Sequence, residues 1–153
     1  MHFFSIEPAQ IRDAPEIAAF NQAIAWETER YELDRSVLEQ GVMAVLQDPL
    51  KGFYVVVRKN NILIASLLIT YEWSDWRAKT IWWIQSVFVE PTHRNQGIFR
   101  HLYLHIKELA KKNDVPIIRL YVEPNNQKAI QTYQKLGMKI QSYWVCEAQA
   151  NIP

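Results

Sequence analysis

The chain contains, from residue 87 to residue 102, the stretch Val87-Phe88-Val89-Glu90-Pro91-Thr92-His93-Arg94-Asn95-Gln96-Gly97-Ile98-Phe99-Arg100-His101-Leu102. An apolar run of β-branched and aromatic residues ends at Pro91, as expected where a strand ends. A polar loop with Gly97 follows, and from Ile98 the apolar residues recur at helical spacing. The stretch therefore predicts a strand, a loop and a helix.

The predicted loop has the chemistry of an anion site. Backbone N–H groups at a helix N-terminus lack intrahelical partners, and the helix dipole favours negative charge there. Arg94 and Arg100 flank the loop and offer cationic donors. The plainer alternative is a polar loop that only precedes an amphipathic helix.

This stretch resembles the pyrophosphate-binding motif of the GNAT superfamily of acetyl-CoA-dependent N-acyltransferases. In that motif a Gln or Arg is followed by Gly at the third position and by a small residue at the fifth. Arg94 and Gly97 match, whereas Phe99 replaces the small residue and Asn95 stands where Gly is common.

A second signature of the same family lies further along the chain. Asn126, Ala129, Tyr133 and the pair Gly137-Met138 fall in its register. The two signatures occur in the family's order, and the resemblance extends from about residue 6 to residue 143. It implies an α/β fold with a GNAT-like mixed central β-sheet, flanked by helices on both faces.

The resemblance also implies a role for each matching residue, with acetyl-CoA as the acyl donor. The main chain of the predicted strand would hold the pantetheine arm and polarise the thioester carbonyl. Tyr133 would be the general acid that protonates the leaving thiolate, although a core tyrosine is the structural alternative; for Asn126 the alternative is a plain helix cap. The implied cofactor-binding residues are Val87, Phe88, Val89, Arg94, Asn95, Gln96, Gly97, Ile98, Phe99, Arg100, Asn126 and Ala129.

The acceptor side is less clearly marked. Residues 72–89 resemble the corresponding region of diamine (spermidine/spermine) acetyltransferases, which place a glutamate base where this chain has Gln85. An amide cannot accept the proton, so the base is not assigned, and an amine that arrives neutral needs no strong base. We predict a small cationic amine as acceptor and a substrate-binding set of Glu29, Glu72, Asp75, Trp76 and Gln85.

The order of the predicted elements is β-α-α-β-β-β-α-β-α-β. Asp13 is expected to cap the first helix, and Asn60-Asn61 to form a hairpin turn. The strand leading to the motif is expected over residues 80–90, and a last strand over residues 140–146 with Cys146 buried in it. A strand–helix–strand unit spans residues 80–122 and should be parallel and right-handed.

Length and composition limit the expected number of domains, the partners and the compartment. The 153 residues suit a single N-acetyltransferase domain over residues 1–153. The net charge of +1 gives no reason to expect nucleic acid or an anionic membrane as partner. One cysteine and no recognisable signal sequence favour the cytoplasm. No apolar run approaches the ~18 residues of a membrane helix.

We therefore expect an acyltransferase that moves acetyl from acetyl-CoA to a primary amine by direct attack, with no covalent enzyme intermediate. A non-catalytic acyl-CoA-binding or regulatory module, and an acetyltransferase of protein or peptide amines, remain as alternatives. His101 and His105 lie four residues apart, but no third ligand accompanies them, so no metal is expected. The sequence leaves a monomer and a homodimer both open.

Overall fold

The structure is a computed structural model and describes residues 4–151. The chain forms two compact units, one ending at Tyr121 and the other beginning at Val122. The expectation of one domain over the whole chain stays a prediction.

The first unit is built on a five-stranded sheet with the order β1-β2-β3-β4-β5. The pairs β1–β2, β2–β3 and β3–β4 are antiparallel, whereas β4 and β5 are parallel. The sheet is therefore mixed, as predicted. The strands are β1 (Ser5–Pro8), β2 (Phe53–Lys59), β3 (Ile62–Ser74), β4 (Lys79–Val89) and β5 (Ile118–Leu120).

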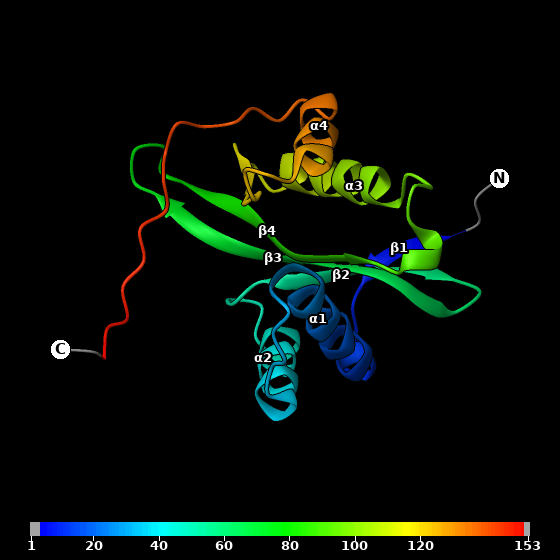
Figure 1. The fold of residues 1–153 in the computed structure, drawn as a ribbon. Coiled ribbons are helices and arrows are strands. Elements are labelled where there is room, and N and C mark those ends of the chain that lie inside the picture. The colour runs from blue at the N-terminus through cyan, green and yellow to red at the C-terminus, as the bar shows by residue number, and fades with distance from the viewer. Residues whose placement is uncertain (1–3, 152–153) are drawn as a thin grey trace. The chain divides into compact units, whose positions relative to one another are not determined.

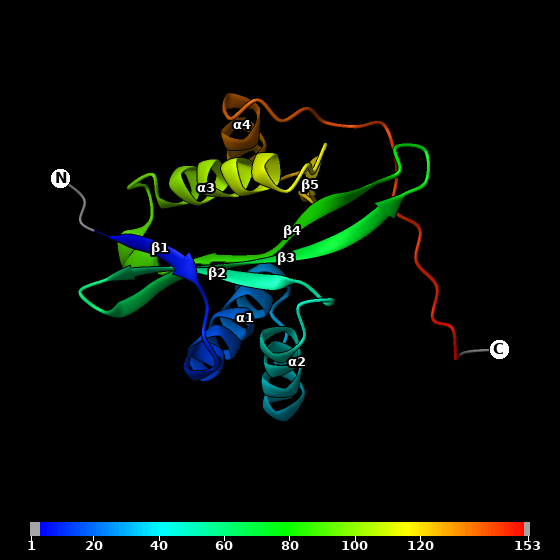
Figure 2. The same cartoon turned by 180° about the vertical axis from the view of Figure 1, so that it is seen from behind.

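Helices cover both faces of this sheet (Figure 1). The helices α1 (Ala14–Glu29) and α2 (Arg35–Gln47) lie on one face, and α3 (Ile98–Lys112) lies on the other, as Figure 2 shows from behind. Short 3-10 helices, η1 (Ile11–Asp13) and η2 (Pro91–His93), precede α1 and the motif loop. The predicted α/β fold with two covered faces is confirmed.

The core of the first unit has one layer on each side of the sheet. On the α1/α2 side, Phe20 and Phe88 pack with ring centroids 4.7 Å apart. On the other side, α3 buries the residues that recur at helical spacing: Ile98, Leu102, Tyr103, Ile106 and Ala110. The strand and helix predicted around the motif therefore form with nearly the predicted bounds, because each has a buried face.

Two local predictions have different outcomes. Asn60 and Asn61 both have positive φ, 51° and 63°, which is the geometry of a hairpin turn and confirms that prediction. Asp13 precedes α1 but makes no side-chain cap. Its buried carboxylate instead accepts from Arg58 on β2 at 2.5 Å and from the N–H of Gln10 at 2.8 Å, so both of its oxygens have partners outside α1.

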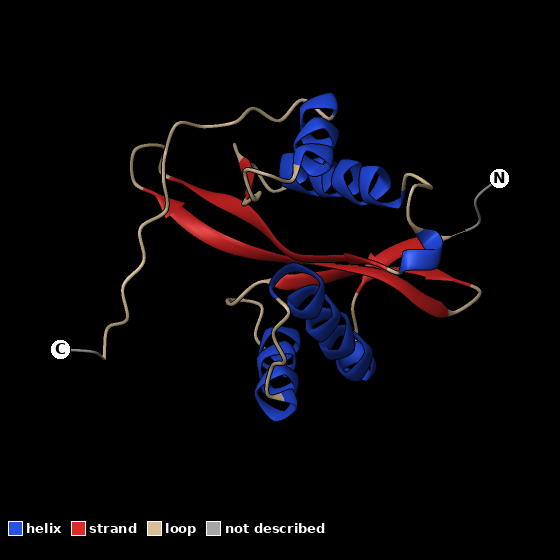
Figure 3. Ribbon diagram, viewed as in Figure 1, coloured by secondary structure: helices blue, strands red, loops and turns tan. Residues whose placement is uncertain are grey.

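The second unit contains α4 (Gln127–Lys135), which ends just before Gly137 at φ 88°. The strand predicted over residues 140–146 does not form, and this part of the chain is loop (Figure 3). Cys146 is exposed rather than buried. A strand needs a neighbour for its N–H and C=O groups, and the second unit offers none among its described residues.

Candidate acetyl-CoA site

The strand β4 loses its β5 neighbour halfway along. Trp82, Trp83 and Ile84 pair with β5, which ends at Leu120. The strand β4 continues to Val89 with β3 on its other side. Within the described residues of the first unit, the stretch from Gln85 to Val89 therefore has main-chain groups that no neighbouring strand uses on the β5 side.

A β-bulge lies in this open part of β4. Ser66 pairs with Phe88 and Leu68 pairs with Gln85, so Ser86 and Val87 together oppose the single residue Leu67. Ser86 has φ 48°, an uncommon value for a residue other than glycine. Bulges bend a strand and redirect its groups, and they are over-represented beside active sites.

The hydrogen bonding shows which amides the open edge presents. The N–H of Glu90 donates to the C=O of Ile64 on β3 at 2.9 Å. Because successive residues of a strand alternate in direction, the amides of Val87 and Val89 point away from β3. These N–H groups face the side on which β5 is missing, where an extended ligand could pair with them like an additional strand.

The loop after β4 brings its backbone to the start of α3. Asn95 and Gly97 both have positive φ, 61° and 75°, and α3 begins at Ile98. The imidazole Nδ1 of His101 donates to the Gly97 carbonyl oxygen at 2.9 Å. A Cβ added at Gly97 would meet only that imidazole, at 3.7 Å from Nδ1. The first N–H groups of α3 follow directly on this loop, and the anion site there stays a prediction.

Arg94 fixes this loop to two other elements. Its Nε donates to the Val89 carbonyl oxygen at 2.8 Å, and its Nη2 donates to both oxygens of Glu27 at 2.8 and 3.0 Å. Its guanidinium also lies 5.5 Å from the centre of the Phe88 ring. Arg94 therefore joins β4 to α1, a positioning role that the sequence did not indicate because Glu27 is 67 residues away.

The remaining loop residues are compatible with an anionic ligand. Gln96 donates to the Thr92 carbonyl oxygen at 3.2 Å and so stabilises the turn. The ring of Phe99 stacks on Tyr103 one helical turn later, with centroids 6.3 Å apart. Arg100 is exposed in the first turn of α3. The open edge and the loop, both made of residues that the sequence marked, fit a ligand with an extended arm and a diphosphate.

The predicted substrate-binding residues divide into separate groups. Gln85 lies on the α1/α2 face, opposite Leu68, and its Nε2 donates to Thr70 at 3.0 Å. Glu29 ends α1 and is exposed. Asp75 and Trp76 lie in the β3–β4 turn. Lys79 and Ser86 are separated by seven residues, so this turn is more than about 20 Å along the strand from the bulge.

Glu72 on β3 belongs to a polar cluster beside the part of β4 that pairs with β5. Its carboxylate accepts from Arg119 on β5 at 3.0 Å and from the indole Nε1 of Trp83 at 2.6 Å. The Trp83 ring also contacts Tyr121, with centroids 4.5 Å apart. The sequence missed Arg119, because nothing in a short apolar strand indicates which charge its cation will pair with.

In the second unit, the signature residues occupy α4 as predicted. Asn126 caps the helix, since its Oδ1 accepts from the Ala129 N–H at 3.1 Å. Tyr133 lies on the same helix, and burial raises the pKa of its phenol. A phenol with a raised pKa holds its proton at neutral pH, which a general acid requires. The roles of Tyr133, Asn126 and Ala129 stay predictions.

Residues 4–151 contain no group of His, Cys, Asp and Glu arranged to hold a metal ion. Their helices are all too short or too polar to cross a bilayer.

Comparison with known proteins identifies relatives along most of the chain. A mycothiol acetyltransferase from Mycobacterium sp. (strain MCS) is 26% identical over 136 residues, which is 85% of this chain and 43% of that protein. The chain thus spans less than half the length of this curated relative. The family model described as "Acetyltransferase (GNAT) family" matches residues 11–138.

Solved structures of similar fold support the same family. A possible acetyltransferase from Clostridium difficile 630 is 41% identical, with a TM-score of 0.89 over 96% of this chain and 97% of that one. A predicted acetyltransferase from Clostridium acetobutylicum, solved with acetyl-CoA, shares the fold at 18% identity, with a TM-score of 0.78 over 95% and 96% of the two chains. The family match and these relatives support one conclusion: the chain belongs to the GNAT family of acetyltransferases.

Proposed function

We propose that this chain transfers an acetyl group from acetyl-CoA to a small primary amine by direct attack in a ternary complex. The observation that carries the proposal is the open, bulged edge of β4 followed at once by the loop before α3. Together they offer main-chain donors for an extended arm and an anion site for its diphosphate.

Each part of the open edge has a proposed task. The amides of Val87 and Val89 pair with the pantetheine arm, and one of them donates to the thioester carbonyl oxygen. That hydrogen bond strengthens as the oxygen gains negative charge, so it stabilises the transition state more than the ground state. Residues 95–100 hold the diphosphate through the N-terminus of α3, with Arg100 as a nearby cation.

The proposed reaction balances without a metal or a redox partner. The ammonium releases one proton to water, and the neutral amine nitrogen forms a bond to the acetyl carbon. The carbon–sulfur bond then breaks, the sulfur leaves with the electron pair, and the nitrogen, which became positively charged on attack, releases its second proton to water. Tyr133 gives its proton to that thiolate and recovers one from water. The products are the N-acetylated amine, the free thiol of coenzyme A and one proton.

The acceptor amine approaches from the α1/α2 face in this proposal. Gln85 lies on that face, just before the bulge, and its amide can orient the amine but cannot take its proton. Glu72 shares its charge with Arg119, so it attracts a cation less strongly than an unpaired carboxylate would. Steering of the amine by Glu29 and Glu72 remains part of the proposal.

One observation favours a second candidate. Since Gln85 supplies no base, the chain could bind acyl-CoA as a regulatory module without turnover. A thiol-release assay with acetyl-CoA and a panel of primary amines separates the two. Release of thiol that depends on the amine supports the enzyme, whereas tight binding of acetyl-CoA without release from any amine or peptide N-terminus supports the module.

Tyr133→Phe tests the proposed acid. It should lower kcat by about 10²-fold or more while leaving acetyl-CoA affinity intact, because only the proton donor is lost. Tyr143→Phe is the matched control, since Tyr143 is exposed and lies outside α4. Wild-type kcat in Tyr133→Phe, measured where chemistry is rate-limiting, would remove Tyr133 from the mechanism.

A further inference from the structure

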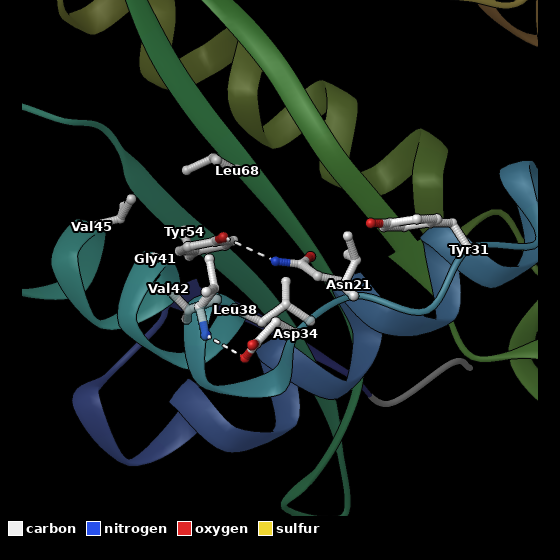
Figure 4. Close-up of a pocket in the computed structure, with 11 residues that line it drawn as sticks. Asn21, Tyr31, Asp34, Leu38, Gly41, Val42, Val45, Tyr54 and Leu68 are labelled. Atoms are coloured by element: carbon white, nitrogen blue, oxygen red, sulfur yellow. Dashed lines mark hydrogen bonds between the residues drawn. The ribbon is translucent and has the colours of Figure 1, made fainter. Parts of the chain in front are cut away.

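A pocket of about 470 Å³ opens between the helical layer and the sheet on the α1/α2 face (Figure 4). Its walls come from α1, from the connector at residues 31–34 and from the inner side of α2. Its floor is formed by Tyr54 on β2 and Leu68 on β3. This volume lies within the range of about 300–1,000 Å³ that is usual for small-molecule sites.

The floor of the pocket adjoins the open edge of β4. Leu68 pairs directly with Gln85, and the bulge at Ser86 and Val87 follows at once. Directly opposite residues on antiparallel strands are about 5 Å apart. A molecule on the pocket floor is therefore one residue pair from Gln85, and Val87 of the bulge is two residues further along β4.

The walls of the pocket are mainly apolar, and its polar groups are neutral or already engaged. Tyr54 is 4% exposed, and burial raises the pKa of its phenol, which therefore stays uncharged at neutral pH. The Nδ2 of Asn21 donates to the Tyr54 hydroxyl at 3.4 Å. Figure 4 shows this hydrogen bond as a dashed line between the two neighbouring side chains.

Asp34 is the charged residue of the pocket lining, and its carboxylate is engaged. Its Oδ1 accepts from the N–H groups of Ser36 and Val37 at 2.8 and 3.2 Å and from the Ser36 hydroxyl at 2.8 Å. These bonds cap α2. Asp34 is exposed, so its charge lies at the solvent-facing rim of the pocket and not beside the buried floor.

These contacts argue against a second ammonium in the pocket. The buried Oδ1 of Asn21 has no hydrogen-bond partner within the described residues. A single amide oxygen repays only part of the desolvation of an ammonium, so a buried cation there would be unfavourable. The same oxygen can accept from a neutral hydroxyl or N–H at much lower cost.

The rim of the pocket supports an apolar occupant. Tyr31 is 59% exposed and Val37 is 63% exposed, and both belong to the lining. An apolar ligand would cover part of these side chains and gain free energy from the area removed from water.

We propose that this pocket holds the body of the acceptor, and that the acceptor is a primary monoamine whose remainder is uncharged and mainly apolar. This inference rests on the proposed function and refines its substrate class: the reacting nitrogen lies at the bulge, and the rest of the molecule occupies the pocket. Diamines, whose second charge would enter the pocket, are poor acceptors.

Gly41 offers a clean way to fill the pocket. It lines the cavity on α2, and a Cβ added there would meet no atom within 4 Å. Gly41→Leu should therefore occupy part of the space without a clash. Gly41→Ala is the matched control, because it makes the same improvement in helix propensity with one carbon.

The experiment measures turnover and binding with n-hexylamine, 1,6-diaminohexane and ethylamine. The wild type should prefer n-hexylamine to the diamine by about tenfold or more in kcat/KM, and Gly41→Leu should raise KM for n-hexylamine by a similar factor, since several buried methylenes lose their contacts. Ethylamine has no tail to place, so its kcat/KM should change by less than about twofold.

Binding without turnover separates the two proposals. The affinity of n-hexylamine is measured by calorimetry on protein saturated with coenzyme A, for the wild type and both Gly41 variants. If n-hexylamine binds and Gly41→Leu alone weakens it, the pocket is confirmed even if no amine is acetylated, and only the enzymatic proposal falls. Equal affinity for the diamine, equal affinity in Gly41→Leu, or no binding of n-hexylamine to the wild type overturns the inference.

Discussion

The two halves of β4 differ in what their outer edge does. In the half from Lys79 to Ile84 the strand has β3 on one side, and Trp82, Trp83 and Ile84 have β5 on the other; the Glu72–Arg119 ion pair lies beside this half. From Gln85 to Val89 it keeps only β3, contains a bulge and leads into the motif loop. Both halves are similarly apolar in sequence, so composition does not distinguish them.

The difference teaches that β4 has unpaired main-chain groups only where its pairing with β5 stops, which is where we propose the acetyl-CoA site. Paired main-chain groups stabilise the sheet and cannot bind a ligand, whereas the amides of Val87 and Val89 are directed to the open side. If this is correct, changes in the open half should impair acetyl-CoA binding and turnover, and changes in the paired half should affect stability and leave acetyl-CoA binding unchanged.

The largest effect is expected at the end of the open half. Gly97→Trp should abolish acetyl-CoA binding in calorimetry, because the indole would occupy the space over the first turn of α3. Gly97→Ala carries the same strain of about 1–2 kcal/mol from its positive φ without the bulk, so it should bind within a few fold of the wild type. Unchanged affinity in a folded Gly97→Trp variant would disprove the phosphate site.

The bulge should be next in magnitude. Val87→Pro removes one outward N–H group, and loss of a comparable donor in other enzymes costs about 10²–10³-fold in kcat. Proline at this open edge removes no hydrogen bond to β3, so the variant should stay folded. Its thermal unfolding is recorded alongside kcat to check this. A folded Val87→Pro variant with wild-type kcat would show that another group polarises the carbonyl.

The paired half should respond mainly in stability, with at most a small change in KM for the amine that Glu72 is proposed to steer. Arg119→Met removes the ion pair with Glu72, whose two side chains are 35% and 41% exposed. Pairs this exposed contribute about 1 kcal/mol or less, so the free energy of unfolding should fall by no more than that in urea. We expect kcat/KM to stay within about threefold of wild type; a larger loss would place the paired half in the mechanism.

The smallest expected effect concerns His105 on α3. Burial, helped by Lys112, lowers the pKa of His105 below its ordinary 6.5. The unfolded chain then binds more protons, so this stabilisation is complete above pH 6.5 and is lost as pH falls toward the folded pKa. Between pH 7.5 and pH 5.5 the Tm of wild type should fall more than that of His105→Gln. An equal fall in both would refute this assignment.

The sequence predicted the elements around the motif because their signals are local. A strand, a loop with Gly97 and a helix with one apolar face can each be recognised within about a dozen residues. The structure has β4 ending at Val89 and α3 starting at Ile98, close to the predicted bounds. The family signatures then indicated which residues of these elements to examine.

What the sequence did not predict depends on distant partners. Ser86 is neither Gly nor Pro, so no residue type at this position indicated a bulge. Arg94 pairs with Glu27, and Asp13 pairs with Arg58, across long sequence separations that periodicity does not encode. The apolar run at residues 140–146 has strand propensity, but propensity forms no strand without a neighbour.

The direct test of the open edge is amide hydrogen exchange, followed by NMR with and without acetyl-CoA. The amides of Val87 and Val89 and those of residues 95–100 should gain protection when acetyl-CoA binds. The amide of Trp82 already donates to Ile117 at 3.1 Å and should change little. Protection confined to other parts of the chain, with Val87 and Val89 unchanged at saturating acetyl-CoA, would contradict the account.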